Sequence, residues 1–336
     1  MEELIINAAG GSYPVIIGNG AIKRVKDFIK GKCLIVADSN VAPLYAEKVK
    51  AQLQGVDCFF AVFPAGESSK CKEQLFRLID KMAEYNINRQ DTVIALGGGV
   101  TGDLTGLAAG LYMRGVSLIM MPTTLLAMVD SSVGGKVAIN HEAGKNMVGM
   151  FYQPSAVIAD LDTLATLDKE QISCGAAEMI KYGCIYDKKL FELLQNKENL
   201  LLESTVKKCV AAKAYYVERD TLDKGDRMLL NFGHTIGHCI EKETGIPHGQ
   251  AVAIGMYKEA QLGESLGLTM AGTAERIKAV TAVYDLPCKA ESYGIEKYLV
   301  HDKKSDNKGI TMALVEEIGK GVLQSISVDK IKEALL

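Results

Sequence analysis

The chain has 336 residues, enough for two domains of ordinary size. Hydrophobic residues make up 48% and charged residues 24%, as in globular proteins. No apolar run reaches the roughly 18 residues that a membrane span needs, so we expect neither a span nor a signal peptide. A net charge of −3 argues against nucleic acid as the main partner. The eight cysteines include no C-x-x-C pair, which excludes a disulfide framework and a cysteine zinc site and indicates the cytoplasm.

Up to about residue 160, short β-rich runs alternate with amphipathic stretches, which predicts a parallel sheet covered by helices. We expect strands at 33–38, 58–63, 92–96 and 117–122. Long helical periods follow, and we expect helices at 169–184, 200–220, 226–243, 249–266 and 272–284, then a strand pair around 310–327. The sequence therefore predicts an α/β fold, with an N-terminal Rossmann-like parallel-sheet domain (1–160) and a mostly α-helical C-terminal domain (161–336).

A glycine cluster, Gly97 to Asp103, follows the strand at 92–96 and opens a helix. It matches G-x-G-x-x-G, whose glycines let the backbone approach a pyrophosphate at a helix N-terminus. The motif alone is weak, because a purely structural turn has the same pattern. No acidic residue ends the next strand, so a ribose-binding acid would have to be Asp38 or Glu67. The absence of Gly-Lys-Ser/Thr excludes a Walker A loop.

Residues 122–149 are expected to form a long loop that carries Asp130, Lys136, Lys145 and Asn146 among glycines. Two lysines and an asparagine could hold a phosphate. A solvated connecting loop is the alternative interpretation.

Polar residues follow one face of the helix expected at 226–243. Arg227, Asn231, His234 and His238 are spaced i, i+4, i+7 and i+11, which predicts a single stripe. Such a stripe favours a site for a metal and an anion, although a solvated helix face remains the alternative. Thr235 stands where H-E-x-x-H has its glutamate, which disfavours metalloprotease chemistry.

Three other residues bear on this site. His248 follows the turn 245–247 and would supply a third imidazole, in keeping with a catalytic zinc site of three protein ligands. Glu178 and Lys181 are spaced i, i+3, as in an ordinary salt bridge on a helix surface. Lys213 lies among apolar and aromatic neighbours, where a lysine on its own more often extends its amine to solvent.

These motifs are similar, in order and over nearly the whole chain, to those of the 3-dehydroquinate synthase family of sugar-phosphate cyclases. The matching segments are ADSNV (37–41), AGESSK, GGGVTGDLTG, PTTLLAMVDSSVGGK, GKNMVGMF, GAAEMIKYG, RMLLNFGHTIGH, PHGQAVAIGM and HDKK (301–304). The resemblance implies a phosphate lyase that makes 3-dehydroquinate from 3-deoxy-D-arabino-heptulosonate 7-phosphate, a sugar-phosphate carboxylate. It also implies NAD and a divalent metal, zinc or cobalt, as cofactors, and a cytoplasmic homodimer that needs neither nucleic acid nor membrane.

The resemblance assigns roles to individual residues. Metal ligands would be Glu178, His234 and His248. NAD would contact Asp38, Glu67, Lys70, Gly98, Gly99, Val100, Thr101, Gly102, Asp103, Thr123, Thr124, Lys136, Lys145, Thr163, Leu164, Ala165 and Thr166. The substrate phosphate would contact Lys136, Asn146, His238, the pair Lys303-Lys304, and Arg114 from a partner subunit. The carboxylate would contact Lys213 and Arg227, and the hydroxyls near the metal would contact Asp130, Lys181 and Asn231.

Three departures from the family pattern stand at Gln250, Met128 and Asp220-Thr221. None replaces an implied ligand, but Gln250 could alter the surroundings of the metal. Three other functions remain open. A glycerol-dehydrogenase-like metal enzyme would reduce NAD stoichiometrically, and a 2-deoxy-scyllo-inosose synthase would use glucose 6-phosphate, which has no carboxylate for Lys213 and Arg227. A non-catalytic NAD sensor would not need the metal set.

Overall fold

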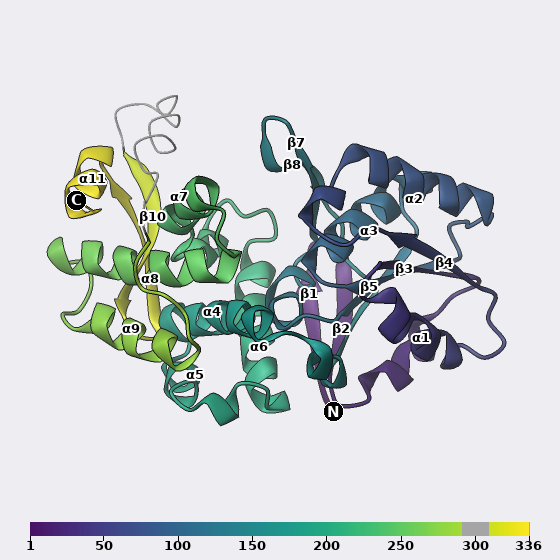
Figure 1. Cartoon of the computed structure of the whole chain (residues 1–336), viewed down its shortest axis with the longest axis horizontal. Helices are drawn as coiled ribbons and strands as arrows, with labels where there is room; N and C mark the ends of the chain where they lie inside the picture. The colour runs from purple at the N-terminus through teal and green to yellow at the C-terminus, as the bar shows by residue number, and fades with distance from the viewer. Residues whose placement is uncertain (291–308, 336) are drawn as a thin grey trace. The chain divides into compact units, whose positions relative to one another are not determined.

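The computed structural model describes residues 1–290 and 309–335, which form two compact units, Met1–Leu167 and Asp168–Leu336 (Figure 1). Each unit has an apolar core of its own. Within the described ranges, no helix combines the length and the apolar character that crossing a membrane requires.

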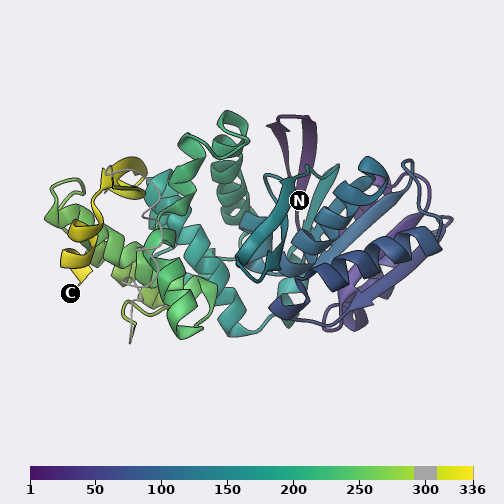
Figure 2. The same cartoon turned by 90° about the horizontal axis from the view of Figure 1, so that it is seen from above.

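A seven-stranded sheet runs through the first unit in the order β1-β2-β9-β6-β5-β3-β4. Figure 2 shows this unit from above. All neighbouring strands are parallel except β1, which pairs antiparallel with β2. The four strands predicted from the sequence are confirmed, and β1, β2 and β9 add to them. The strands are β1 Glu2–Ala8, β2 Gly11–Gly18, β3 Cys33–Asp38, β4 Cys58–Phe63, β5 Thr92–Gly97, β6 Ser117–Pro122 and β9 Ala156–Asp160.

The central strands are buried on both faces, as their unbroken apolar runs predict. Ile35, Ile94 and Ile119 pack against Val25 and Val49 on one of these faces. The helices of this unit are α1 Glu47–Ala51, α2 Lys72–Glu84 and α3 Gly99–Leu111, with shorter turns at Ala21–Phe28, Ala42–Ala46, Glu67–Ser69, Tyr112–Arg114, Ala127–Ser131 and Leu161–Thr166.

The order of the strands reverses between β3 and β5. From β3 the chain crosses to β4 on one side, then returns to β5 on the other side and continues to β6 and β9. Because β3 and β5 are parallel neighbours, their carboxyl ends, Asp38 and Gly97, lie side by side. In open α/β sheets such a switch point is where ligands bind.

The prediction of a long loop at 122–149 is wrong. This segment contains a helical turn at Ala127–Ser131 and an antiparallel hairpin of β7 (Lys136–His141) and β8 (Gly144–Phe151). The inward side chains of β7, Val137 and Ile139, alternate with more exposed residues, which is the period of a strand packed on one face. Lysines, glycines and polar residues obscured that alternation in the sequence.

The second unit is mostly helical, as predicted, with a two-stranded sheet. Ile236 and Ile240 pack against Ile254 of the next helix and against Met312 and Leu314 of the sheet. Its elements are α4 Lys169–Ile185, α5 Lys188–Leu193, α6 Glu203–Arg219, α7 His234–Thr244, α8 His248–Ser265, α9 Thr273–Val283, β10 Ile310–Glu317, β11 Lys320–Ile326 and α11 Val328–Leu335, with short 3-10 turns at Lys197–Asn199 and Asp226–Asn231.

The single helix expected at 226–243 is wrong. A 3-10 turn at Asp226–Asn231 comes first, Phe232 and Gly233 form a turn, and α7 begins only at His234. Gly233 lies between them with φ of 80°, a left-handed conformation that breaks the helix and suits glycine. Arg227 and Asn231 therefore do not share a helical stripe with His234 and His238.

Candidate functional site

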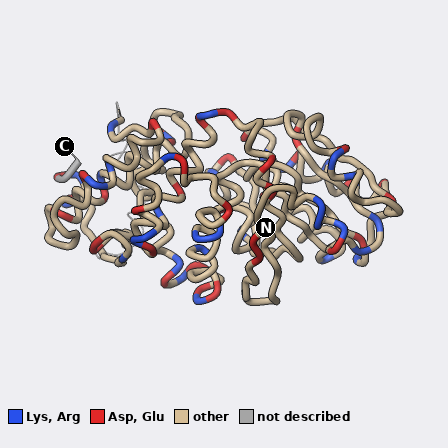
Figure 3. Tube along the Cα trace, turned by 90° about the horizontal axis from the view of Figure 1, so that it is seen from below, with Lys and Arg blue, Asp and Glu red and all other residues tan. Residues whose placement is uncertain are grey.

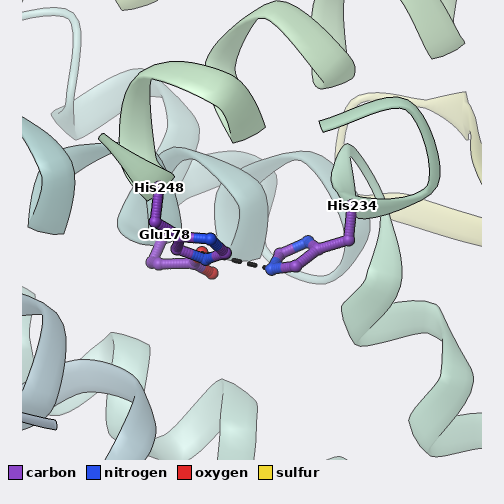
Figure 4. A group of neighbouring side chains, drawn as sticks. All are labelled: Glu178, His234 and His248. Carbon is purple, nitrogen blue, oxygen red and sulfur yellow. Dashed lines mark ion pairs between the residues drawn. The ribbon is translucent and has the colours of Figure 1, made fainter. Parts of the chain in front are cut away.

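Three side chains from three different helices meet in the second unit (Figure 4). Glu178 lies in the middle of α4, and His234 and His248 are the first residues of α7 and α8. The Nε2 atoms of both histidines lie 3.4 Å from Oε1 of Glu178. One nitrogen or oxygen from each residue lies within 4.8 Å of the others, so the three groups could bind one metal ion.

A glycine lets α8 approach α4 closely enough for this arrangement. A Cβ on Gly249 would lie 2.3 Å from Cα of Cys174, one helical turn before Glu178 on α4. Any side chain at position 249 would push the two helices apart and His248 with them. Close packing of α8 against α4 thus explains why a glycine follows His248 at the start of α8.

Glu178 is buried with 1% of its surface exposed, and neither carboxylate oxygen has a hydrogen bond within the described part of the chain. Instead, Lys181 Nζ lies 2.5 Å from Oε2, and the two imidazoles face Oε1. Burial would raise the pKa of Glu178, but Lys181 and His234 hold it well below its usual value. One carboxylate and two imidazole nitrogens suit Zn²⁺ or Co²⁺, so the residues present fit a divalent metal.

The remaining nitrogens of the two histidines are also held in place. Nδ1 of His248 lies 3.0 Å from Oε2 of Glu241, and Nδ1 of His234 lies 3.1 Å from the carbonyl oxygen of Phe232. Such partners fix the ring orientation of a metal ligand. Sequence reasoning missed Glu241, because nothing in EKET distinguishes it from Glu243 until α7 and α8 are packed together.

The electrostatics separate the three histidines. Burial lowers the pKa of His234. Burial opposes the charged form of His248 too, but the adjacent carboxylates of Glu178 and Glu241 outweigh this and raise its pKa to about 9. Desolvation next to His234 and His248 lowers the pKa of His238 to about 4, so its ring is neutral at physiological pH. The centre of the His238 ring lies 5.3 Å from that of His234 and 5.9 Å from that of His248.

Three cations that the sequence places at the site of this unit are buried. Lys181 is 2% exposed in its ion pair with Glu178, so the alternative of a surface salt bridge is wrong. Lys213 on α6 is 6% exposed, which contradicts an amine extended to solvent. Arg227 is 1% exposed, and its Nη1 donates a hydrogen bond to the carbonyl oxygen of Thr221 at 2.8 Å. The side chain of Asn231 is exposed.

Asp220 holds the loop before Arg227. Its Oδ2 accepts hydrogen bonds from the backbone N–H of Gly225 at 2.6 Å and of Arg227 at 3.3 Å, and its Oδ1 accepts one from Lys224 at 3.1 Å. These bonds favour the charged carboxylate, and they lower its pKa. Asp220, the acidic member of the pair Asp220-Thr221 that departs from the family pattern, therefore shapes the Arg227 loop.

In the first unit, predicted nucleotide-binding residues meet at the switch point. Asp38 ends β3, and its Oδ2 lies 3.3 Å from Oγ1 of Thr101 on α3. A Cβ on Gly98 would lie 3.1 Å from Cγ2 of Thr124, so the glycine turn packs tightly against the P-T-T segment. Gly98 caps α3 and offers no side chain to its first N–H groups. These groups, next to Asp38, fit a dinucleotide pyrophosphate and ribose.

Lys70 connects the predicted nucleotide residues with a predicted phosphate contact. Its buried Nζ donates hydrogen bonds to Oδ2 of Asp103, at 2.5 Å, and to Oδ1 of Asn146 on β8. Asn140 joins the same network, because its Nδ2 donates to Oε1 of Glu67 at 2.7 Å and its Oδ1 accepts from the N–H of Asn146 at 2.9 Å. Sequence reasoning missed Asn140, which lies 73 residues from Glu67.

The remaining predicted residues lie at several places. The turn Leu161–Thr166, which contains Leu164 and Ala165, is anchored by Tyr45, whose hydroxyl lies 3.1 Å from the carbonyl oxygen of Thr163 and 2.6 Å from Oγ1 of Thr166. Sequence reasoning did not find Tyr45. Lys136 and Lys145 are exposed on the β7–β8 hairpin, and Arg114 is exposed before β6. Asp130 is half-buried in Ala127–Ser131, Thr123 is buried, and Val100 and Gly102 lie in the first turns of α3. Lys303 and Lys304 lie outside the described residues.

Comparison with known proteins agrees with this arrangement. Residues 60–174 match the family model of the 3-dehydroquinate synthase N-terminal domain, and residues 175–305 match that of the C-terminal domain. A 3-dehydroquinate synthase of Clostridium beijerinckii is 41% identical over 98% of this chain and 99% of its own.

Two solved structures are similar throughout. A 2-deoxy-scyllo-inosose synthase in complex with carbaglucose-6-phosphate, NAD⁺ and Co²⁺ has a TM-score of 0.90 at 28% identity and covers 99% of both chains. A 2-epi-5-epi-valiolone synthase from Streptomyces hygroscopicus with NAD⁺ and Zn²⁺ bound has a TM-score of 0.87 at 28% identity, covering 96% of this chain and 95% of its own. Two family models and a full-length relative at 41% identity lead to one conclusion: this chain belongs to the 3-dehydroquinate synthase family.

Proposed function

We propose that this enzyme converts 3-deoxy-D-arabino-heptulosonate 7-phosphate to 3-dehydroquinate and phosphate, in the shikimate pathway that leads to chorismate and the aromatic amino acids. The observation that carries the proposal is the Glu178, His234 and His248 cluster, which lies in the same unit as the buried cations Lys213 and Arg227. A metal site alone would suit an enzyme that oxidises any of many alcohols. The two buried cations in the same unit would in addition suit a substrate that carries a carboxylate.

Two cofactors would supply the chemistry. Bound NAD would oxidise the C5 hydroxyl to a ketone by accepting the hydride from C5, while the hydroxyl loses its proton, and it would return the hydride to C5 after phosphate has left; a divalent metal would polarise that hydroxyl. Glu178, His234 and His248 would hold the metal. The α3 N-terminus, with Gly98 to Asp103, would hold the pyrophosphate, and Asp38 the adjoining ribose. The other NAD contacts would be Glu67, Lys70, Thr123, Thr124, Lys136, Lys145 and the turn from Thr163 to Thr166.

The chain's own side chains would orient the substrate. Lys213 and Arg227 would bind its carboxylate by charge-assisted hydrogen bonds. Lys136, Asn146, His238 and Lys304, with Arg114 of a second subunit, would bind the phosphate group, whose own oxygens can take the C6 proton. Lys181, Asp130 and Asn231 would bind the hydroxyls. With its pKa near 4, His238 would bind as a neutral ring that can donate or accept a hydrogen bond.

The network around Lys70 supports a link between nucleotide and phosphate. Lys70 donates to Oδ1 of Asn146, so the amide NH₂ of Asn146 is the end left to face an anion. The same amine contacts Asp103 in the glycine turn. The phosphate contact and the nucleotide turn would therefore be positioned by one buried cation.

We further propose a homodimer that works in the cytoplasm without nucleic acid or membrane. Arg114 is flanked by Leu111 and Met113, which are 50% and 44% exposed, and β8 exposes Met147 and Val148. Exposed apolar side chains such as these would be covered by a partner subunit. All eight cysteines are free, in keeping with a reducing compartment, and basic and acidic residues are interspersed along the chain (Figure 3).

The experiment that tests this function compares two substrates. Purified enzyme with NAD and zinc or cobalt would be incubated with the heptulosonate phosphate or with glucose 6-phosphate, and inorganic phosphate would be measured. We expect release from the heptulosonate only, because Lys213 and Arg227 would bind its carboxylate. Release from glucose 6-phosphate at a similar rate would instead assign the chain the chemistry of a 2-deoxy-scyllo-inosose synthase.

A further inference from the structure

A buried carboxylate on α8 has no assigned part in the site described above. Glu259 is 0% exposed and lies about three helical turns after His248. Oε2 accepts a hydrogen bond from the backbone N–H of Gly233 at 2.6 Å, and Oε1 accepts one from Ile236 at 3.0 Å. The backbone N–H of Thr235 is a third donor. No cation pairs with Glu259 in residues 1–290 and 309–335, so its partners are the N–H groups at the start of α7.

The start of α7 needs such a partner from elsewhere. The first N–H groups of a helix lack acceptors within it, and a Ser, Thr, Asp or Asn at the N-cap usually supplies one. Here the N-cap is Gly233, with φ of 80°, and a Cβ there would lie 2.5 Å from Cγ of Met256 and 2.9 Å from the carbonyl oxygen of Val252. Close packing against α8 therefore excludes a capping side chain at position 233. Glu259 of α8 instead accepts the hydrogen bonds from the N–H groups at the start of α7.

This contact fixes where α7 begins relative to α8. A Cβ on Gly255 would lie 1.9 Å from the carbonyl oxygen of Gly233, so the two backbones touch. His234 follows Gly233 directly, and its ring contacts the carbonyl oxygen of Phe232 and the carboxylate of Glu178. A shift of the α7 start would carry the His234 imidazole with it. Helix α8 would thus fix the positions of both imidazoles. His248 is the first residue of α8, and Glu259 of α8 would position His234 by capping α7.

We propose that Glu259 is a positioning residue for the metal ligand His234, which it places by capping α7 from α8. The inference rests on the metal site proposed above. Burial raises the pKa of Glu259 to about 8, against the three N–H donors that favour its charged form. Both oxygens act as acceptors, so an amide of the same shape would turn an NH₂ group toward a backbone N–H and leave that donor without an acceptor.

Glu264 offers a matched control on the same helix. Its Oε1 accepts a hydrogen bond from the N–H of Ala274 at 2.7 Å, in the first turn of α9. The glycine before that helix, Gly272, also has no capping side chain. Glu264→Gln therefore makes the same side-chain exchange at the start of a helix that carries no proposed metal ligand, where one amide oxygen can still accept the single hydrogen bond from Ala274.

The test is cobalt binding by metal-free protein, followed by chelator competition and by the visible absorption of Co²⁺, which reports its ligand geometry. We expect Glu259→Gln to raise the cobalt dissociation constant by about 10- to 100-fold, as loss of an outer partner of a metal ligand does, and to change the spectrum. Glu264→Gln should match wild type in both. Wild-type affinity and spectrum in Glu259→Gln would overturn the inference while leaving the metal site intact. A wild-type chain that binds no cobalt would overturn the metal site, and this inference with it.

A measurement on the wild-type chain keeps the inference testable if Glu259→Gln does not fold. In metal-free protein, the amide hydrogens of Gly233, Thr235 and Ile236 should exchange with solvent as slowly as those in the middle of α7, because Glu259 already holds them. Exchange at the rate of a frayed helix end would overturn the proposal.

Discussion

A buried carboxylate needs cations or donors around it, and Glu178 has one ammonium and two imidazoles within 3.4 Å. A bound divalent metal would be a second cation next to Lys181. The Glu178 carboxylate would then bind both the metal and the Lys181 ammonium. The imidazoles contribute neutral nitrogens only after they lose their protons. Side-chain predictions follow from this balance.

Replacing His234 by alanine removes one of the two proposed nitrogen ligands of the metal. We expect His234→Ala to lose bound zinc and to lower the turnover rate by orders of magnitude. His141→Ala is the control, because His141 lies exposed at the end of β7 and contacts the N–H of Ala143. Metal content by atomic emission checks both variants. Full activity in a chelated, metal-free sample would contradict the role of the metal.

Metal affinity should rise with pH. Without metal, Glu178 and Glu241 raise the pKa of His248 to about 9, above the usual 6.5, so the folded protein holds a proton there that the unfolded chain releases earlier. That contribution to stability is complete below pH 6.5 and is lost as pH rises through 9. A metal must displace the proton, so below pH 9 the apparent affinity should increase about tenfold per pH unit. Calorimetric titrations from pH 6.5 to 9 measure this, and an affinity independent of pH would contradict it.

Arg227→Met should discriminate between ligands. A charge-assisted hydrogen bond to the substrate carboxylate contributes about 1.5–3 kcal/mol. The variant should therefore bind the heptulosonate phosphate at least about tenfold more weakly, while inhibition by inorganic phosphate stays near wild type. Equal losses for both ligands would mean that Arg227 acts through the Thr221 loop that it holds.

Among single residues, the sequence predicted those that belong to a recognisable motif. Spacing alone put His234 and His238 on one helix face, but only the family resemblance implied Glu178, since an i, i+3 pair with Lys181 also suits a surface. Glu241, Asn140 and Glu259 could not be found, because each acts on a partner that the fold, not the sequence, brings near.

Glycines decide how closely the helices of the second unit pack. The carbonyl oxygen of Gly233, just before α7, lies against Gly255 of α8, whereas a Cβ on Gly102 of α3 would meet only the flexible side chain of Met120, at 3.6 Å from its sulfur. Both glycines lie inside helices, where alanine is intrinsically favoured by about 1 kcal/mol. Helix propensity is therefore the same for alanine at both positions, and steric contact should make the two substitutions differ in their effect on the free energy of unfolding.

Gly255→Ala should lower the free energy of unfolding by about 1–3 kcal/mol through overpacking against Gly233. Gly102→Ala should leave the free energy of unfolding unchanged or raise it by up to about 1 kcal/mol. Denaturant unfolding of both variants compares them directly. Similar stability in the two would show that α7 and α8 can separate without cost.

Strand prediction succeeded where burial is almost uniform, as in β3, β5 and β6, because an apolar run between two turns is typical of a buried strand. The β7–β8 hairpin was missed because its apolar residues alternate with glycines, lysines and asparagines that suggest a binding loop. The break before α7 was missed because the periodicity of Arg227, Asn231 and His234 continues through Gly233, where the left-handed backbone depends on packing against Met256.

For the whole molecule, each unit would hold its own cofactor, with the nucleotide at the end of β3 and β5 and the metal among α4, α7 and α8. In the proposed reaction NAD is oxidised and reduced within one cycle, which separates it from a glycerol-dehydrogenase-type reaction that consumes NAD.

The most direct test follows phosphate, dehydroquinate and absorbance at 340 nm together, with enzyme, NAD, metal and heptulosonate phosphate. We predict equal amounts of phosphate and dehydroquinate with no accumulation of NADH, and no activity in enzyme stripped of NAD until NAD is restored. NADH that accumulates in proportion to product would contradict the proposed function.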